Sequence, residues 1–179
     1  MLGTAVALLL TQAGEKVAPL VEGPSRPART GRAGLVGLAE TFLRTEDRSA
    51  IPPWAVAGTT QAIYISDFYT DADGLLAQLG RMAAQGVPVH LVQVSDSAER
   101  LFPFAGRVRF EAPDDPNSHV QFGDADHVAA AYRERRDAHL GALKDVCRRY
   151  GFTYLAHETS EPASVPLAAL YHAVGGGTR

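Results

Sequence analysis

The sequence predicts an α/β fold with an open, mostly parallel sheet and helices on both faces. Apolar runs of strand length alternate with helical patterns over residues 62–174, and this alternation is typical of parallel strands joined by helical crossovers. The chain has 179 residues, of which 46% are hydrophobic and 21% charged. A chain of this composition can bury its own core, so we expect one domain over residues 1–174 and a flexible tail over residues 175–179.

The N-terminal third is predicted to form a hairpin, a loop and one helix. The apolar run at residues 5–10 has strand length, and residues 16–21 alternate after a turn, which together predict an antiparallel hairpin. Residues 23–32 are rich in Pro, Gly and Arg, as in a loop. Apolar residues at helical spacing over residues 33–43 predict an amphipathic helix, and a polar connector follows over residues 45–60.

The centre of the chain predicts a strand, a helix and a second strand. Residues 62–66 and 87–94 are short apolar runs typical of buried strands. Residues 73–85 between them repeat apolar positions at helical spacing. Asp71 or Asp73 can cap this helix, because a carboxylate accepts the free amide protons of the first turn.

The C-terminal part begins with a small hairpin. Residues 102–110 and 119–122 flank a turn rich in Pro, Asp and Asn, which favours a hairpin. A helical period then runs over residues 125–150, with Asp124 or Asp126 as the expected cap. The last two predicted elements are a strand at residues 152–156 and a helix at residues 165–174.

Charge and cysteine content narrow the class of protein. The net charge of −3 gives no general attraction to nucleic acid or to an anionic membrane. No segment approaches the roughly 20 apolar residues that span a bilayer. The single cysteine, Cys147, excludes an internal disulfide and lies in an apolar helical pattern, which favours packing over reactivity. We therefore expect a cytoplasmic protein.

Polar residues follow two of the predicted strands directly. Ser66 and Asp67 end the first, and ligands of open α/β sheets bind beyond the carboxyl ends of strands. Asp71 extends Asp67 into a carboxylate cluster, but no EF-hand glutamate follows, so we expect Asp71 to act as a cap. Asp96 and Glu99 follow the next strand at the same edge, and we expect Asp96 to cap a turn.

Several motifs resemble the domain-of-unknown-function family 58. Ser95 to Glu111 resembles the family's Asp-Pro-x-Glu…Pro-Phe-x-Gly-x-Val-x-Phe block, and Ile65-Ser66-Asp67-Phe68 is similar to its Ser-Asp-Phe after the fourth strand. Residues 131–139 are similar to its long helix, and residues 157–162 to its Thr-Asp-x-Pro turn. Members of this family carry a von Willebrand factor type A-like domain. The resemblance therefore implies a Rossmann-like version of the open, mostly parallel sheet.

The resemblance also implies a metal-ion-dependent adhesion site. The matching residues are Thr30 in the second loop, with Ser66 and Asp67 after the fourth strand, and together they would contribute to binding Mg²⁺. The family's Asp-x-Ser-x-Ser loop occurs nowhere in the sequence. We therefore expect a degenerate or incomplete site in a fold that lacks the usual first strand and helix. The unpaired edges left by that strand would be closed by direct pairing of other strands or by dimerisation.

Two functions remain open from the sequence. The resemblance implies a non-enzymatic protein-interaction module whose partner is a MoxR-type AAA+ ATPase, bound through the edge that carries Thr30, Ser66 and Asp67. It also implies that a membrane-anchoring hairpin, frequent in the family, would lie upstream. The alternative, based on the carboxylates alone, is a metal-dependent phosphohydrolase that uses Asp67 and Asp71 with Mg²⁺.

Overall fold

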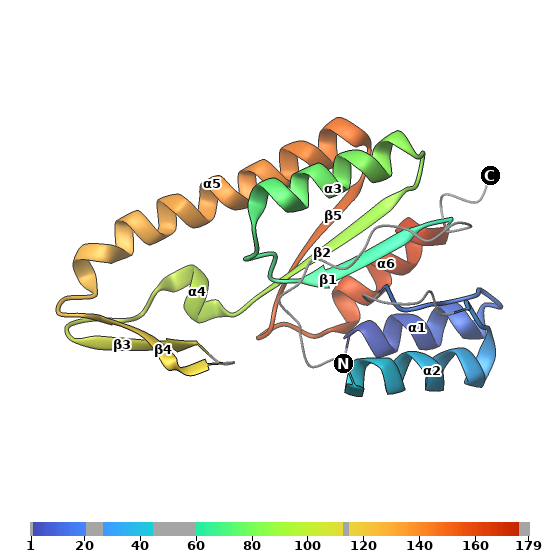
Figure 1. The fold of residues 1–179 in the computed structure, drawn as a ribbon, viewed down its shortest axis with the longest axis horizontal. Coiled ribbons are helices and arrows are strands. Elements are labelled where there is room, and N and C mark those ends of the chain that lie inside the picture. Colours follow the sequence, from blue (N-terminus) through green and yellow to red (C-terminus); the bar gives the residue numbers. More distant parts are fainter. Residues whose placement is uncertain (1, 21–26, 45–59, 113–114, 176–179) are drawn as a thin grey trace.

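A three-stranded parallel sheet forms the centre of the molecule (Figure 1). Its strands are β1 (Ala62–Ser66), β2 (Val89–Ser95) and β5 (Thr153–Glu158), in the order β1-β2-β5. In this computed structural model, the described residues are 2–20, 27–44, 60–112 and 115–175. The prediction of a parallel sheet over the C-terminal two-thirds of the chain is confirmed.

Helices cover both faces of the sheet, as predicted. Helix α3 (Ala72–Ala84) follows β1, helix α5 (Asp126–Tyr150) precedes β5, and both contribute to the core on one face. On the other face, α1 (Leu2–Gln12) and α6 (Ser164–Gly175) pack on the opposite side chains of the same strands. The molecule therefore has three layers, helix on sheet on helix.

Strand β2 is buried on both faces. Val89 and Leu91 pack into the core under α3 and α5, whereas Val92 packs into the core under α1 and α6. Leu79 and Met82 of α3 are 0% exposed and complete the first of these cores. Side chains alternate between the faces of a strand, so a central strand buries side chains on both faces, and in β2 these include the polar residues His90, Gln93 and Ser95.

Capping residues fix several of the predicted boundaries. The Gly74 amide donates to Asp71 Oδ2 at 2.9 Å, which confirms Asp71 as the N-cap of α3. Asp96 likewise caps α4 (Ser97–Leu101). The N-cap of α5 is Ala125, which makes no side-chain cap, although the Asp126 amide donates to Asp124 Oδ1 at 3.1 Å.

The predicted N-terminal hairpin is wrong. Residues 5–10 lie within the helix α1 (Leu2–Gln12), and residues 16–20 contribute only an isolated antiparallel bridge between Val17 and Arg29. A short apolar run fits a buried helix as well as a buried strand. The many Leu and Ala residues here favour helix, and the Thr11 hydroxyl donates to the Ala7 carbonyl at 2.8 Å within it.

Helix α2 (Gly31–Arg44) confirms the amphipathic helix expected over residues 33–43. It packs on α1, and Leu38 and Thr41 of α2 are buried. The connector predicted over residues 45–60 falls almost wholly outside the described residues. Of the predicted tail, Gly175 belongs to α6 and residues 176–179 are not described.

A hairpin of β3 (Val108–Ala112) and β4 (Asp115–Phe122) projects from the sheet beside the first half of α5 (Figure 1). The strand predicted over residues 102–110 is shorter, because Phe102 ends α4 with a left-handed φ of 46°. An aromatic cluster holds this arm on α5, and it consists of Phe102, Phe104, Phe110, Phe122 and Tyr132.

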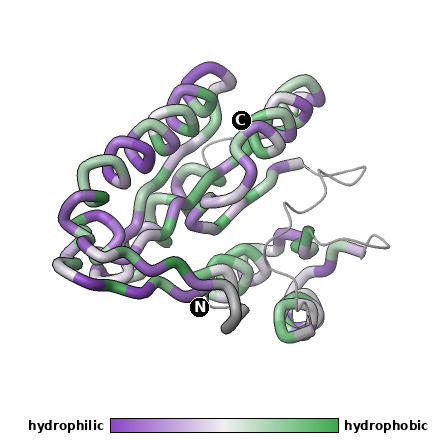
Figure 2. Tube along the Cα trace, turned by 60° about the vertical axis from the view of Figure 1, so that its left-hand side comes forward, coloured by the Kyte–Doolittle hydropathy of each residue, from purple (hydrophilic) through white to green (hydrophobic). Residues whose placement is uncertain are grey.

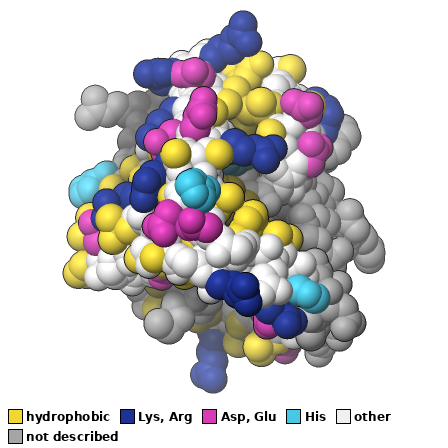
Figure 3. Space-filling model, turned by 90° about the vertical axis from the view of Figure 1, so that its left-hand side faces the viewer, with side chains coloured by type: hydrophobic (Ala, Val, Ile, Leu, Met, Phe, Trp, Pro, Cys, Tyr) yellow, Lys and Arg dark blue, Asp and Glu magenta, His cyan; other side chains and the backbone are white. Residues whose placement is uncertain are grey.

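The surface of the molecule around this arm is of mixed charge. Figure 3 shows Lys and Arg side chains interspersed with Asp and Glu side chains on the face at that end of the molecule. Along α5, hydrophilic and hydrophobic residues alternate (Figure 2), as expected for a helix with one buried and one solvated face. Within the part of the chain that is described, no helix combines the length and apolar character needed to cross a membrane.

Candidate functional site

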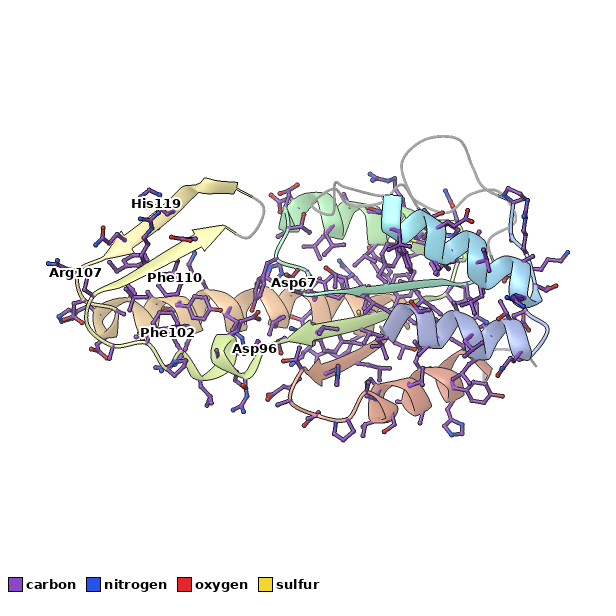
Figure 4. All side chains as sticks on the ribbon, turned by 90° about the horizontal axis from the view of Figure 1, so that it is seen from below. Asp67, Asp96, Phe102, Arg107, Phe110 and His119 are labelled. Atoms are coloured by element: carbon purple, nitrogen blue, oxygen red, sulfur yellow. The ribbon has the colours of Figure 1, made fainter. Side chains whose placement is uncertain are left out.

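Polar side chains from all three parallel strands meet at the carboxyl edge of the sheet. They surround an open depression of about 310 Å³, which we call the carboxyl-edge depression. Asp67 follows β1 and Asp96 follows β2, and the two lie close together in Figure 4. The residues that line the depression are Ile65, Ser66, Asp67, Val94, Ser95, Asp96, Glu99 and Thr159.

Ser66 and Asp67 build the turn after β1. The Phe68 amide donates to Ser66 Oγ at 3.1 Å, and the Tyr69 amide donates to Asp67 Oδ1 at 3.1 Å. The Ser66 hydroxyl also donates to Asp67 Oδ1, at 3.3 Å. These bonds hold Phe68 at a φ of 61°, a region that non-glycine residues rarely adopt, and the Phe68 side chain is buried. Asp67 Oδ1 therefore stabilises this turn by accepting hydrogen bonds from Ser66 and Tyr69.

Asp96 connects the turns after β2 and β5. Its Oδ1 accepts the Ala98 amide at 2.8 Å, and its Oδ2 accepts the Thr159 hydroxyl at 2.9 Å. The Thr159 amide in turn donates to the Ser95 carbonyl at 2.9 Å. Hydrogen bonds to an ionised carboxylate favour the charged form, so the Ala98 amide and then Thr159 lower the pKa of Asp96.

Glu99 is the third carboxylate of the depression and has the opposite shift. Burial is the largest cause and raises its pKa, and the negative charges of Asp67 and Asp96 also raise it, whereas a hydrogen bond with the Asp96 backbone and the charge of Arg136 lower it in part. Its Oε2 is buried and has no hydrogen-bond partner among the described residues, and the same is true of Nε of Arg136 on α5. The ionised form of Glu99 is thus partly buried and lies near two other carboxylates, of Asp67 and Asp96.

Aromatic and amide groups lie next to the depression on the α5 side of the sheet. Gln93 is the register partner of Ser66, and the Tyr154 hydroxyl donates to Gln93 Oε1 at 3.4 Å. The Tyr69 ring stacks on His139, with 5.9 Å between ring centroids. Burial is the largest cause that raises the pKa of Tyr69 to about 12. Tyr69 is therefore a neutral hydroxyl near neutral pH.

Thr30 does not lie with Ser66 and Asp67. It immediately precedes α2, whereas Phe42, near the other end of that helix, is the residue that lies with Ile65 against Gly3 of α1. A 14-residue helix is about 20 Å long, so Thr30 is separated from the carboxyl edge by most of that length. The structure brings Ser66 and Asp67 together but leaves Thr30 apart.

The donor set at this edge does not fit a magnesium site. The described residues contain no group of three or more His, Cys, Asp and Glu side chains placed to hold a metal ion. Asp67 Oδ1 and Ser66 Oγ already accept backbone amides. Octahedral magnesium needs several oxygen ligands directed at one point, and this turn directs them at the backbone instead. Asp71 is likewise engaged, since its Oδ2 caps α3.

Three residues at or beside the depression, Thr159, Gln93 and Arg136, are not among the site residues predicted from the sequence. Thr159 could have been found, because it directly follows β5 and the carboxyl ends of neighbouring parallel strands meet at one edge. Gln93 could also have been found, because a polar residue within a mostly apolar strand often has a specific hydrogen-bonding role. Arg136 has no such signal, because it lies among other charged residues of α5 and only the packing of that helix on the sheet buries it.

Comparisons with known proteins identify no relative: no family profile, curated protein or solved structure matches this chain. The fold and the site therefore define a mixed α/β protein with an acidic, open surface at the carboxyl edge of a three-stranded parallel sheet.

Proposed function

We propose that this chain is a non-enzymatic protein-interaction module of the domain-of-unknown-function 58 type, with a von Willebrand factor type A-like fold and a degenerate adhesion site. The proposed partner is a MoxR-type AAA+ ATPase. The observation that carries the proposal is that three carboxylates, of Asp67, Asp96 and Glu99, gather with the Thr159 hydroxyl at one open edge of the parallel sheet. The motif resemblance at residues 65–68 and 95–111 supports the identity of the partner.

The electrostatics of the edge favour a basic group on the partner. The lowered pKa of Asp96 favours its ionised form, whereas the raised pKa of Glu99 reflects destabilisation of its ionised form, mainly by burial. A Lys or Arg side chain placed in the depression would relieve that destabilisation and lower the pKa of Glu99. Arginine suits the edge best, because its planar guanidinium can donate to two carboxylate oxygens at once.

We propose that binding of the partner at this edge does not require magnesium. Asp67 and Ser66 are committed to the turn after β1, and Thr30 lies apart from them. The acidic surface itself is the recognition element, so removal of divalent cations from the module leaves its affinity unchanged. The phosphohydrolase alternative is not favoured by any contact at the site, because Asp71 caps α3.

The test is calorimetric binding of the purified chain to a purified MoxR-type ATPase without nucleotide and with EDTA. The double variant Asp67→Asn, Glu99→Gln removes two charges from the edge, and we expect its affinity to fall at least about tenfold. Glu40→Gln, an equally isosteric change on the exposed side of α2, is the matched control and should bind as the unaltered chain does. Equal affinity of the double variant and the control, or no measurable binding of the unaltered chain, would contradict the proposal.

A further inference from the structure

An arginine lies on the side of α5 that faces the protein interior. The inward residues of this helix recur every three or four positions and are Tyr132, Arg136, Leu140, Leu143 and Cys147. The four others belong to or pack against the apolar clusters, whereas Arg136 brings a positive charge to the same side. Only 13% of its side chain is exposed. A charge that is buried to this extent normally has a counter-ion.

Two contacts hold this part of α5 beside the carboxyl-edge depression. The Arg133 guanidinium donates to the Leu101 carbonyl at the end of α4, at 3.0 Å. Further along the helix, His139 Nε2 lies 2.7 Å from the carbonyl oxygen of Phe68, in the turn after β1. Arg136 is midway between these two contacts and is thereby held near α4, which carries Glu99.

The charge of Arg136 acts on the groups around it. Burial is the largest cause that raises the pKa of three side chains in this region, and the positive charge of Arg136 opposes the increase in each of them. The three side chains are those of Glu99, Tyr69 and Tyr154. Glu99 is the carboxylate among them, so it is the group that can form an ion pair with Arg136.

In the structure, however, Arg136 pairs with Asp137. Its Nη1 donates to Asp137 Oδ1 at 3.0 Å, and 70% of the Asp137 side chain is exposed. Arg136 Nε and Glu99 Oε2 are both buried, and neither has a hydrogen-bond partner among the described residues. A buried donor or acceptor without a partner is costly, whereas an exposed ion pair contributes little stability. Pairing of Arg136 with Glu99 would satisfy both buried atoms and lose only the weak outer pair.

We infer that Arg136 is a movable counter-ion that alternates between Asp137, as in this structure, and Glu99. In the inner arrangement its guanidinium donates to Glu99 Oε2 and neutralises that carboxylate. In the outer arrangement Glu99 is open to a basic side chain that enters the depression. Arg136 and the basic group of a partner therefore compete for one carboxylate, and binding of the partner favours the outer arrangement.

This competition regulates the site of the proposed function. It rests on that proposal in one respect, namely that a basic group binds in the depression. Because Glu99 lines the depression while Arg136 belongs to the inward side of α5, the two counter-ions approach Glu99 from different directions. The apparent affinity for a basic group is lowered by the fraction of the chain in which Arg136 occupies Glu99.

The first test follows the Nε–H group of Arg136 by NMR in the isolated chain, in which we expect the inner arrangement to predominate. Arg136→Lys lacks this signal and so assigns it. Pairing with Glu99 protects the proton from exchange with water, and Glu99→Gln should raise its exchange rate at least about tenfold. Glu134→Gln is the control, because it removes the same charge from an exposed position of α5 and should leave the rate unchanged.

The second test measures binding of the peptide acetyl-Gly-Arg-Gly-amide through the amide signals of residues 95–99. Arg136→Gln removes the internal competitor. The peptide should therefore bind it at least about threefold more tightly than it binds Arg135→Gln, which removes the same charge from the next, exposed position. Should Arg136→Gln fail to fold, Asp137→Asn disfavours the outer arrangement and should bind the peptide at least about threefold more weakly than Glu134→Gln does.

Equal exchange rates of the Arg136 Nε–H group in Glu99→Gln and Glu134→Gln would overturn the inference, because Glu99 would then not protect this proton. Equal peptide affinities of Arg136→Gln and Arg135→Gln would overturn it too, since Arg136 would not compete with the peptide. Failure of the peptide to bind any variant, with protection by Glu99 intact, would refute the proposed basic-group site and leave the pair of Arg136 and Glu99 standing.

Discussion

The Thr159 hydroxyl donates to Asp96 Oδ2 at 2.9 Å and so joins the turns that follow β2 and β5. The two residues are 63 positions apart in the chain, yet they are neighbours because their parallel strands end at the same edge. The bond orients the Asp96 carboxylate beside Asp67 and Glu99. It thus links the sheet topology to the acidic surface that we propose as a partner-binding site.

Removal of this bond should raise the pKa of Asp96. In Thr159→Val the hydroxyl donor is lost while the shape of the side chain is kept, so the carboxylate loses one of the two bonds that favour its charged form. An NMR titration of the side-chain carboxyl carbons measures the shift. Ser160→Ala at the next, exposed position is the control and should leave the titration of Asp96 unchanged. An unaltered Asp96 titration in Thr159→Val would contradict the assigned role.

His90 should make the folded chain sensitive to mild acid. It is 4% exposed, its Nε2 lies 2.9 Å from Gln61 Oε1, and its Nδ1 lies 3.1 Å from Thr153 Oγ1. Burial lowers the pKa of His90 below its ordinary value of 6.5. As the pH falls through 6.5, the unfolded chain gains a proton at this residue before the folded chain does, so the free energy of unfolding decreases.

Denaturant unfolding between pH 7.5 and pH 5 measures this loss. His90→Gln keeps hydrogen-bonding capacity without a group that titrates in this range, so its stability should depend less on pH than that of the unaltered chain. His172→Gln, at an exposed position of α6, should keep the original pH dependence. A pH dependence that is the same in both variants would show that His90 is not responsible.

Truncation of a buried side chain in the core beneath α3 should destabilise the folded chain. Leu79 is 0% exposed and packs with Met82 and Leu91, so Leu79→Ala leaves a cavity in addition to the lost burial. We expect a decrease of about 2–5 kcal/mol in the free energy of unfolding. Leu101→Ala, at a residue that is 53% exposed, should cost less than about 1 kcal/mol. Equal losses in urea titrations of the two variants would argue against this packing.

Cys147 should be inert in the folded chain. It is 2% exposed, and burial raises the pKa of its thiol to about 11, so the reactive thiolate is scarce at neutral pH. We expect very slow reaction with a disulfide reagent in buffer and rapid reaction in denaturant. Fast modification of the native chain would show that α5 opens away from the sheet or is packed differently.

Much of the central fold could be predicted from the sequence. Asp71 caps the start of α3, and Gly86 separates that helix from the apolar run of β2. The local preferences of these residues therefore favour the same helix and strand that their burial in the core favours. The N-terminal run that forms α1 could not be assigned, because an all-apolar segment has no periodicity to separate helix from strand. Only its packing against α2 and α6 decides the outcome.

The candidate site was predictable in part. Ser66, Asp67 and Asp96 follow strands, and the topology rule for parallel sheets brings them to one edge. Thr30 is assigned by resemblance alone, and it lies at the start of the 14-residue helix α2, whose other end, at Phe42, is the end near Ile65. The buried position of Arg136 depends on how α5 crosses the sheet, which no local pattern encodes.

The central claim is that the acidic carboxyl edge binds the partner, and the most direct test is NMR mapping of the complex. The isotope-labelled chain is titrated with the unlabelled, purified MoxR-type ATPase, and the amide signals are followed. We predict that the largest changes occur at residues 66–69, 95–99 and 159, and that they weaken as salt is raised. Changes confined to the β3–β4 arm or to α1 and α2, with the carboxyl edge unaffected, would contradict the claim.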